Sequence, residues 1–233
     1  GNEDTAISVD VTGALGDLDE AASILISGVP AGAKLSAGTY DAATDTWTLN
    51  PDQVAGLTVT PFENSDVDFS LTISEIDADG NQTGLGYIDV DVKGIADAAS
   101  LDLDAEDNDA PSAEAGATSI ELDITAGLTD TDGSETLSIT ISGVPQGATL
   151  SAGAYDEATD TWTLTEAELA GLTVESVDGL SGDFTLTVTA TTSEIDGGYT
   201  TSVSGDITVV VGEDDLPDAP SLDLDLTKDG EQL

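Results

Sequence analysis

Residues 184–192 read Phe-Thr-Leu-Thr-Val-Thr-Ala-Thr-Thr, a run in which apolar and polar side chains alternate. A period of two places the apolar side chains on one face of an extended strand, which is typical of a β-strand with one face buried. Runs of this kind, separated by turn residues, occur throughout the second half of the chain. They are residues 120–125, 137–142, 161–164, 172–175, 184–192 and 203–211, with a weaker run at 148–150.

The same set of strands is expected in the first half, and only residues 165–169 and their counterpart 50–54 suggest a helical turn. Seven short strands in roughly 100 residues are typical of an antiparallel Greek-key β-sandwich. The fold class we expect is therefore all-β, with sandwiches of immunoglobulin or cadherin type.

An internal repeat divides the chain. Ile26-Ser27-Gly28-Val29-Pro30 recurs 115 residues later as Ile141-Ser142-Gly143-Val144-Pro145. A period of this length is that of a domain, so each repeat should have its own core. We expect a first sandwich at 1–96, an acidic linker with a second sandwich at 97–216, and the start of a following module or a tail at 217–233. The last expectation rests on Ser221 to Asp225, which copies Ser100 to Asp104.

Negative charge dominates the composition, with 48 Asp and Glu against three lysines and a formal net charge of -45. Such a chain repels itself unless salt or bound cations screen it. It cannot neutralise phosphates, so nucleic acid is excluded as a partner, as is direct contact with an anionic membrane. An alternative is a disordered acidic chain. The regular apolar runs between the acids favour a folded monomer.

The side chains used most often in catalysis are missing. The chain has neither His nor Cys, so the usual bases, nucleophiles and transition-metal ligands are absent. Paired carboxylates can hydrolyse glycosides, but only from a cleft that raises the pKa of one of them, and these acids follow turns. We expect no enzymatic activity.

The acidic turns suggest calcium as the cofactor. Ca²⁺ prefers six to eight oxygen ligands, which carboxylates on a loop with a turn-forming Gly can supply, as in Asp130-Thr131-Asp132-Gly133-Ser134-Glu135. Solvated acidic loops are the alternative. Recurrence of the acids at corresponding turns, with few basic partners, favours shared cations. The candidate ligands are Asp17, Asp19, Glu20, Glu75, Asp77, Asp79, Asp97, Asp107, Asp109, Asp130, Asp132, Glu135, Glu194, Asp196 and Asp218.

Strand order predicts which of these clusters meet. In a sandwich, the loop after the first strand and the hairpin between the last two strands lie at opposite poles. We therefore expect Asp17, Asp19 and Glu20 beside the exit of the first domain and Glu194 and Asp196 beside the entrance of the second. Calcium bound there would couple the two domains through the acidic linker.

Two tryptophans define the main alternative function. Trp47 alternates with Leu49 and Trp162 with Leu164, which favours a place in the sandwich core. Alternatively, with Tyr40 and Tyr155 nearby, they form a platform of a lectin-like or peptide-binding module. Ligand binding would distinguish this module from a spacer.

The sequence resembles the cadherin-like and immunoglobulin-like extender repeats of RTX adhesins, giant bacterial proteins exported by type I secretion. The resemblance rests on Gly1 to Ile7, on Gly127 to Leu137 and on the Ile-Ser-Gly-Val-Pro runs. In addition, Glu106 to Pro111 is similar to a cadherin calcium linker. The resemblance implies calcium-rigidified spacers at the bacterial cell surface, outside the cell, which serve adhesion and biofilm formation and contact neighbouring repeats of the same chain.

Overall fold

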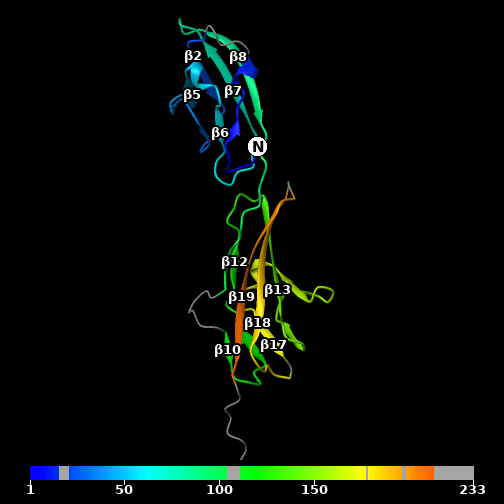
Figure 1. Cartoon of the computed structure of the whole chain (residues 1–233). Coiled ribbons are helices and arrows are strands. Elements are labelled where there is room, and N and C mark those ends of the chain that lie inside the picture. The colour runs from blue at the N-terminus through cyan, green and yellow to red at the C-terminus, as the bar shows by residue number, and fades with distance from the viewer. Residues whose placement is uncertain (16–20, 104–110, 177, 196–197, 213–233) are drawn as a thin grey trace, which may run out of the picture.

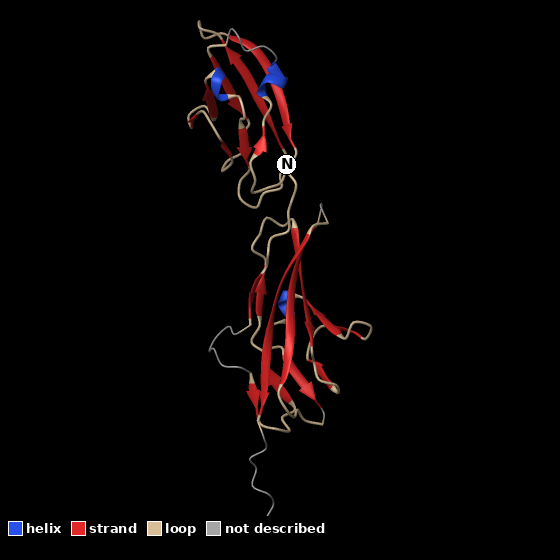
Figure 2. Cartoon of the chain, viewed as in Figure 1, coloured by secondary structure: helices blue, strands red, loops and turns tan. Residues whose placement is uncertain are grey.

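The computed structural model describes residues 1–15, 21–103, 111–176, 178–195 and 198–212 of the chain. Two β-sheet domains follow one another along the chain and lie end to end, joined by a short connector (Figure 1). Strands dominate both domains, and the few helical segments are one or two turns long (Figure 2). Within these residues no helix is long and apolar enough to cross a lipid bilayer. The segment 217–233, including Asp218, lies outside the described residues.

The first domain is a sandwich of two antiparallel sheets. The larger sheet has the order β4-β5-β2-β7-β8 and the smaller the order β1-β6-β3. A helix, α1, and a 3-10 turn, η1, lie between strands. The bounds are β1 (Ile7–Ser8), α1 (Val11–Leu15), β2 (Ser23–Ser27), β3 (Lys34–Leu35), β4 (Thr39–Asp41), β5 (Thr46–Leu49), η1 (Pro51–Gln53), β6 (Thr58–Thr60), β7 (Phe69–Ile76) and β8 (Gln82–Val90).

The second domain repeats this plan with additional strands. Its large sheet has the order β10-β19-β18-β13-β16-β15, and two small sheets have the orders β11-β17-β14 and β12-β9. The bounds are β9 (Ser100–Asp102), β10 (Ser112–Ala113), β11 (Ser119–Glu121), β12 (Thr125–Gly127), β13 (Glu135–Ser142), β14 (Ala148–Leu150), β15 (Ala154–Asp156), β16 (Thr161–Leu164), η2 (Glu166–Glu168), β17 (Thr173–Ser176), β18 (Phe184–Glu194) and β19 (Thr200–Val211).

Each domain has its own aliphatic core, built from the alternating strand positions. In β18, Leu186, Val188 and Ala190 are fully buried, as the period of two in their sequence requires. In the first domain, Ile24 and Ile26 of β2 are likewise fully buried at alternating positions. The buried residues form one cluster from Val9 to Val92 and another from Ala99 to Val211. The predicted fold of tandem immunoglobulin-like or cadherin-like sandwiches is confirmed.

The predicted helical turns are present as η1 and η2. Asn50 donates its backbone N–H to Gln53 Oε1 at 2.8 Å, and Thr165 donates its N–H to Glu168 Oε2 at 2.8 Å. In each turn, the side chain of the third residue thus accepts the backbone N–H of the residue that precedes the turn. This is one of the two hydrogen bonds of a capping box. Both repeats therefore begin the 3-10 turn that follows the Trp-containing strand with the same kind of hydrogen bond.

Two predictions about local structure were wrong. The single strand expected over 120–125 is interrupted, since β11 ends at Glu121 and β12 begins at Thr125. The first domain does not give the same set of strands, because the counterpart of β12 is the helix α1. The short strands β9, β10 and β15 were not predicted, since two or three residues are too few to show a period.

One predicted acidic loop, with Asp17, Asp19 and Glu20, lies outside the described residues. The residues on either side of it are placed. Ala22 donates its N–H to the carbonyl of Ile76 at 2.8 Å, beside the β7–β8 hairpin. The chain leaves the first domain at the other end of β8. The flanks of this segment therefore lie at the pole opposite the connector, not beside it.

Candidate functional site

The connector between the domains is held on both sides by acidic side chains. Ile95 donates its N–H to Glu3 Oε1 at 2.6 Å, and Asp97 donates its N–H to Glu135 Oε1 at 2.6 Å. Glu3 belongs to the first domain and Glu135 to the second. Consecutive parts of the connector are thus bound to different domains. We call the acidic groups around this connector the joint.

A second contact links the domains without the connector. Asn64 Nδ2 donates to the carbonyl of Thr129 at 3.4 Å, while the backbone N–H of Asn64 donates to Asp4 Oδ1 at 2.9 Å. Thr129 in turn donates its hydroxyl to the carbonyl of Ala98 at 3.0 Å. The 61–66 loop of the first domain therefore meets the 128–135 loop of the second at the joint.

Strand register brings the acids of the second domain together. Glu135 begins β13 and Glu194 ends β18, and the two residues are paired across the antiparallel ladder. The preceding loop is folded by its own carboxylates, since Asp130 Oδ1 accepts from the N–H of Asp132 at 2.9 Å and Asp132 Oδ1 from that of Ser134 at 2.8 Å. Gly133, with φ at 99°, allows this tight turn. The loop thus delivers Asp130 to the side of Glu135.

Four carboxylates at the joint are buried: Glu3 is 3% exposed, Asp130 2%, Glu135 6% and Glu194 3%. Four of their oxygens have no hydrogen-bond partner, namely Glu3 Oε2, Glu135 Oε2 and both oxygens of Glu194. An unpaired polar group away from water costs free energy, and a buried charge costs more. Carboxylate oxygens in this state favour a proton, a bound water or a cation as partner.

The pKa values of these groups are raised. Burial raises the pKa of Glu3 to about 7, and the charges of Asp130, Asp4 and Glu194 add to this, while the hydrogen bond from Ile95 opposes it.

Burial also raises the pKa of Asp97, Glu135 and Glu194, with smaller contributions from neighbouring carboxylates. For Glu194 the first of these neighbours is Glu135, and for Glu135 it is Asp130. The joint therefore disfavours its own ionised form unless positive charge is supplied.

The donor set fits a hard divalent cation. Several buried carboxylate oxygens without partners, in a region without His or Cys, match the oxygen ligands that Ca²⁺ takes. Among the described residues, no three carboxylates already converge in the geometry of a metal shell. The side chains approach one another closely enough to interact electrostatically.

The structure gathers some predicted site residues and separates others. It brings together Asp97, Asp130, Asp132, Glu135 and Glu194 at the joint. It places Glu75, Asp77 and Asp79 at the β7–β8 hairpin, at the far pole of the first domain. The remaining candidates, Asp17, Asp19, Glu20, Asp107, Asp109, Asp196 and Asp218, lie outside the described residues.

The hairpin cluster is a self-contained turn. Asp77 Oδ1 accepts the N–H groups of Asp79 at 2.9 Å and Asn81 at 2.8 Å, and the hydrogen bonds from Asn81 lower the pKa of Asp77. This carboxylate already has its partners. The described geometry thus accounts for Asp77 without a cation.

Four residues of the joint were missed by the sequence analysis: Glu3, Asp4, Glu63 and Asp66, all from the first domain. They lie far from the connector in the sequence. Glu3 reaches it through a parallel bridge between Asn2 and Lys93, where Glu3 donates its N–H to the carbonyl of Lys93 at 3.0 Å. The sequence carries no local signal for this pairing.

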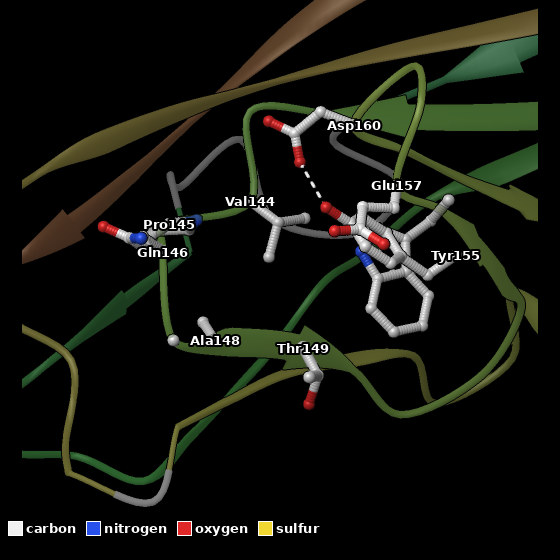
Figure 3. Close-up of a pocket in the computed structure, with 10 residues that line it drawn as sticks. Val144, Pro145, Gln146, Ala148, Thr149, Tyr155, Glu157 and Asp160 are labelled. Carbon is white, nitrogen blue, oxygen red and sulfur yellow. Dashed lines mark hydrogen bonds between the residues drawn. The ribbon is translucent and has the colours of Figure 1, made fainter.

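A groove on the second domain is the other candidate site (Figure 3). Its volume is about 600 Å³, and its lining includes Val144, Pro145, Tyr155, Asp160 and Trp162. Tyr155 donates its hydroxyl to Asp160 Oδ1 at 2.7 Å, drawn as the dashed line in Figure 3. The Tyr155 and Trp162 rings lie 5.3 Å apart and are tilted by 40°.

The first domain repeats this groove. Its lining includes Val29, Pro30, Tyr40, Asp45 and Trp47. The hydroxyl of Tyr40 donates to Asp45 Oδ1 at 2.8 Å, and the two rings lie 5.4 Å apart. Each chain therefore has two related aromatic grooves, one in each domain.

The tryptophans are not the buried core residues that the alternation predicted. Trp47 and Trp162 pack against the cores but remain half-buried, whereas Leu49 and Leu164 on the same strands are buried. In both repeats the strand with the Trp lies near the edge of its sheet, next to the three-residue strand β4 or β15. One side of the indole is therefore left to line the groove.

Comparison with protein-family models and with curated proteins gave no match for this chain. Among solved structures, it is similar to the fibronectin(III)-like modules of Clostridium thermocellum CbhA, with 13% identity, 93% of this chain and 90% of that chain covered, and a TM-score of 0.29. The D00-D0 domain of intimin gives 14% identity, 90% and 94% coverage and a TM-score of 0.32.

Domains EC1-3 of Drosophila N-cadherin give 18% identity, 84% coverage of this chain and 57% of that chain, and a TM-score of 0.28. All three are built of immunoglobulin-like, fibronectin-like or cadherin-like domains. At these scores the likeness carries no argument about function. The fold assignment rests on the strands and the two cores of this chain.

Proposed function

We propose that the chain is a calcium-binding spacer of a bacterial cell-surface adhesin, in which calcium at the joint stiffens the connection between the two domains. One observation carries this proposal: Glu194, at the tip of β18, is buried against the connector at Gly94, where neither carboxylate oxygen has a hydrogen bond of good geometry and the nearby Ser134 hydroxyl opposes the rise of its pKa. Burying such a carboxylate costs free energy that a bound cation would offset. It is consistent with a ligand to a cation that joins the domains.

The residues that would hold the ion come from both domains. Glu3 belongs to the first domain, Asp97 to the connector, and Asp130, Glu135 and Glu194 to the second. A bound calcium ion would supply positive charge that all of these carboxylates share. The protein holds these carboxylates on strand ends and tight turns. Little conformational freedom is therefore lost when they bind the ion.

Without a cation the same residues would work against the joint. Like charges a few ångströms apart in a poorly hydrated site repel strongly. Their repulsion, together with the freedom of the connector, should let the domains move apart. The joint would thus be stiff at extracellular calcium levels and loose where calcium is low.

This proposal places the protein outside the cell, as a repeat that holds other modules of an adhesin away from the surface. Extender repeats of RTX adhesins, which serve adhesion and biofilm formation, are the class that the sequence resembles. The proposed partners are calcium ions and neighbouring repeats, without nucleic acid or direct membrane contact. We propose no enzymatic role, because the chain has no His or Cys and its buried acids face the connector.

Thermal melts with calcium and with a chelator test the proposal. Ligand that binds only the folded state stabilises it by about 2.7 kcal/mol at a hundredfold excess over the dissociation constant. We expect a clear rise in melting temperature with calcium and little with magnesium, which retains its water shell. Glu194→Gln should reduce the rise, and Glu121→Gln, at an exposed position of β11, should not. Identical melts in calcium and chelator would refute the proposal.

The second candidate function is a ligand-binding module that uses the aromatic grooves. It is favoured by the half-buried Trp47 and Trp162, each placed beside a tyrosine and an aspartate in the same arrangement. Aromatic faces beside carboxylates suit the stacking and hydrogen bonding of a sugar. Tryptophan fluorescence reports on both grooves, because the chain has no other tryptophan. Quenching by a glycan that is reduced in each single variant, Trp162→Phe and Trp47→Phe, would support this function, and a glycan array without hits would exclude binding of a sugar.

A further inference from the structure

The two aromatic grooves are built on one plan, which includes the hairpin that carries the tyrosine. In the second domain Asp156 Oδ1 accepts the N–H of Ala158 at 2.9 Å, and in the first Asp41 Oδ1 accepts that of Ala43 at 2.9 Å. The aspartate that accepts the tyrosine hydroxyl has φ at 54° in both domains. The two hairpins therefore have the same backbone, and a difference between the grooves has to come from side chains.

The grooves differ in charge. Glu157 lines the groove of the second domain, and the residue at its place in the first repeat is Ala42. Lys34 lines the groove of the first domain, and the residue at its place in the second repeat is Thr149. The described lining of the second groove thus has the carboxylates of Glu157 and Asp160 and no basic group, whereas that of the first has a lysine beside its one aspartate.

Both carboxylates of the second groove lie at its tyrosine. The hydrogen bond to Asp160 raises the pKa of Tyr155, and the nearby charge of Glu157 adds to this. Figure 3 shows Glu157 beside Tyr155 on the same side of the groove. Within the described part of the chain, no hydrogen bond or ion pair engages the Glu157 carboxylate. This carboxylate is therefore free to accept hydrogen bonds from a ligand.

An aromatic pair flanked by carboxylates suits a cation. The face of an aromatic ring attracts positive charge, and one side of the Trp162 indole is left to the groove. A planar guanidinium can stack on such a ring while it donates N–H groups to carboxylates. A quaternary ammonium has no such donors and is bound by a cage of aromatic rings, but this groove offers one pair. The groove therefore fits a guanidinium better.

The size and charge of the surroundings agree with this ligand. A volume of about 600 Å³ holds an arginine side chain with part of its backbone, because sites for small ligands measure about 300–1,000 Å³. Figure 3 shows Val144 across the groove from Tyr155, where it offers apolar surface to the methylene groups of an arginine. The net charge of -45 attracts cations to every face of the molecule. The lining of the groove decides where an arginine stays.

We propose that the groove of the second domain binds the guanidinium of an arginine side chain on a partner protein, and that the groove of the first domain does not. The guanidinium would stack on Trp162 and donate N–H groups to Glu157 and Asp160. In the first groove Lys34 repels the same cation, and Ala42 offers no acceptor. This site does not depend on calcium at the joint, and it selects its ligand by charge, which a site for a neutral sugar does not. It therefore goes beyond both functions proposed above.

The two indole N–H resonances of the isotope-labelled chain report on one groove each, because Trp47 and Trp162 are its two tryptophans. The probe is N-acetylarginine amide, and the matched control is N-acetylcitrulline amide, which has the same shape without the charge. Calcium and total ionic strength are held constant. The Trp162 signal should saturate at an arginine concentration lower than that of citrulline by about tenfold or more. The Trp47 signal should need about fivefold more arginine than the Trp162 signal, or not respond.

Three outcomes would overturn the proposal. They are an equal response to the arginine and citrulline probes, equal shifts of the two indole signals, and no shift at all. Saturation by tetramethylammonium at a lower concentration than by the arginine probe would assign the groove to a quaternary ammonium and would also overturn it. None of these outcomes changes the thermal melts in calcium, so a failure here is distinguishable from a failure of the calcium site.

Variants test whether the charges of the lining carry the selectivity. Glu157→Gln should weaken binding of the arginine probe by about fivefold or more, whereas Glu121→Gln, which removes the same charge outside the groove, should leave it unchanged. Lys34→Thr with Ala42→Glu gives the first groove the charges of the second and should make it respond to arginine as the second does. Thermal melts check that each variant is folded. A folded Glu157→Gln chain that binds arginine equally well, or a first groove that gains no response, would overturn the proposal.

Discussion

Glu194 lies directly over the Cα of Gly94, so that a Cβ at residue 94 would overlap the Glu194 carboxylate. Glu194 ends the longest pair of strands in the second domain, and Gly94 is in the connector. The tip of the second domain therefore touches the connector that leaves the first domain, and the contact joins the carboxylate of Glu194 to the backbone of Gly94. This contact is where the stiffness of the joint can be tested most directly.

Gly94→Ala should displace Glu194 from the connector. We expect this variant to lose much of the rise in melting temperature that calcium gives, because one ligand is moved by the added methyl group. Gly212→Ala is the matched control, since its Cβ would meet its nearest neighbour, Ala113 O, only at 3.8 Å. A Gly94→Ala protein with the full calcium response would show that Glu194 does not take part in the site.

Glu3→Gln should have opposite effects with and without calcium. In chelator, the folded protein has a Glu3 pKa of about 7 against 4.5 for the exposed group. A raised pKa favours folding at low pH, and this stability is lost as pH rises from about 4.5 through 7. The variant should therefore melt higher than the natural chain at pH 8 in chelator. In calcium it should melt lower, because a charged ligand is missing.

The order of the two melting curves is the informative result for Glu3→Gln. Differential scanning calorimetry at pH 5 and at pH 8, each with chelator and with calcium, gives all four comparisons. A variant that is less stable under every condition would show that Glu3 only accepts the hydrogen bond from Ile95. In that case the cation would have to be held by the second domain alone.

Asp97→Ala should loosen the joint while the domains stay folded. The carboxylate of Asp97 is partly buried among Asp4, Asp130 and Glu63, from both domains. Small-angle scattering in calcium should change from one narrow, elongated form to a broader distribution of interdomain angles. Asp52→Ala, on the exposed turn η1, should scatter like the natural chain. If the scattering of the natural chain does not change on chelation, calcium does not control the stiffness of the joint, even if it binds there.

Trp162→Ala should cost less stability than its size suggests. Complete burial of a tryptophan would give a loss of roughly 3–5 kcal/mol, but part of this side chain already faces the groove, so we expect about 2 kcal/mol. Leu164→Ala, at a position 2% exposed on the same strand, should cost at least as much despite removing fewer atoms. Chemical denaturation of both variants compares them. A loss above 4 kcal/mol for Trp162→Ala would restore the core assignment.

The sequence predicted the strands wherever alternation was long enough to be read. Leu186, Val188 and Ala190 are an example, because burial on one face of a strand follows from position alone. Residues 11–15 show the limit. Their pattern is almost that of residues 124–128, yet they are helical, whereas residues 125–127 form β12, which pairs with the distant strand β9.

The joint was predicted only in part for the same physical reason. Asp130, Asp132 and Glu135 form a recognisable acidic turn, and its neighbour Glu194 belongs to the predicted hairpin. Glu3 could not be found, because the parallel bridge between Asn2 and Lys93 joins residues about 90 positions apart without a motif. Asp17, Asp19 and Glu20 lie outside the described residues, so their predicted place beside the connector stays a prediction.

The parallel pairing at the ends of the first domain has a mechanical consequence. Asn2 pairs in parallel with Lys93, and Glu3 donates its N–H to the carbonyl of Lys93 while Lys93 donates its own to the carbonyl of Gly1. Traction on the two ends of a domain pulls such parallel neighbours in opposite directions along their length, so their hydrogen bonds share the load and must break together rather than one after another. We expect the first domain to yield abruptly at high force in single-molecule stretching, and a gradual extension would show that the load takes another path. A tether built from such domains would hold its length under flow until a whole domain gives way.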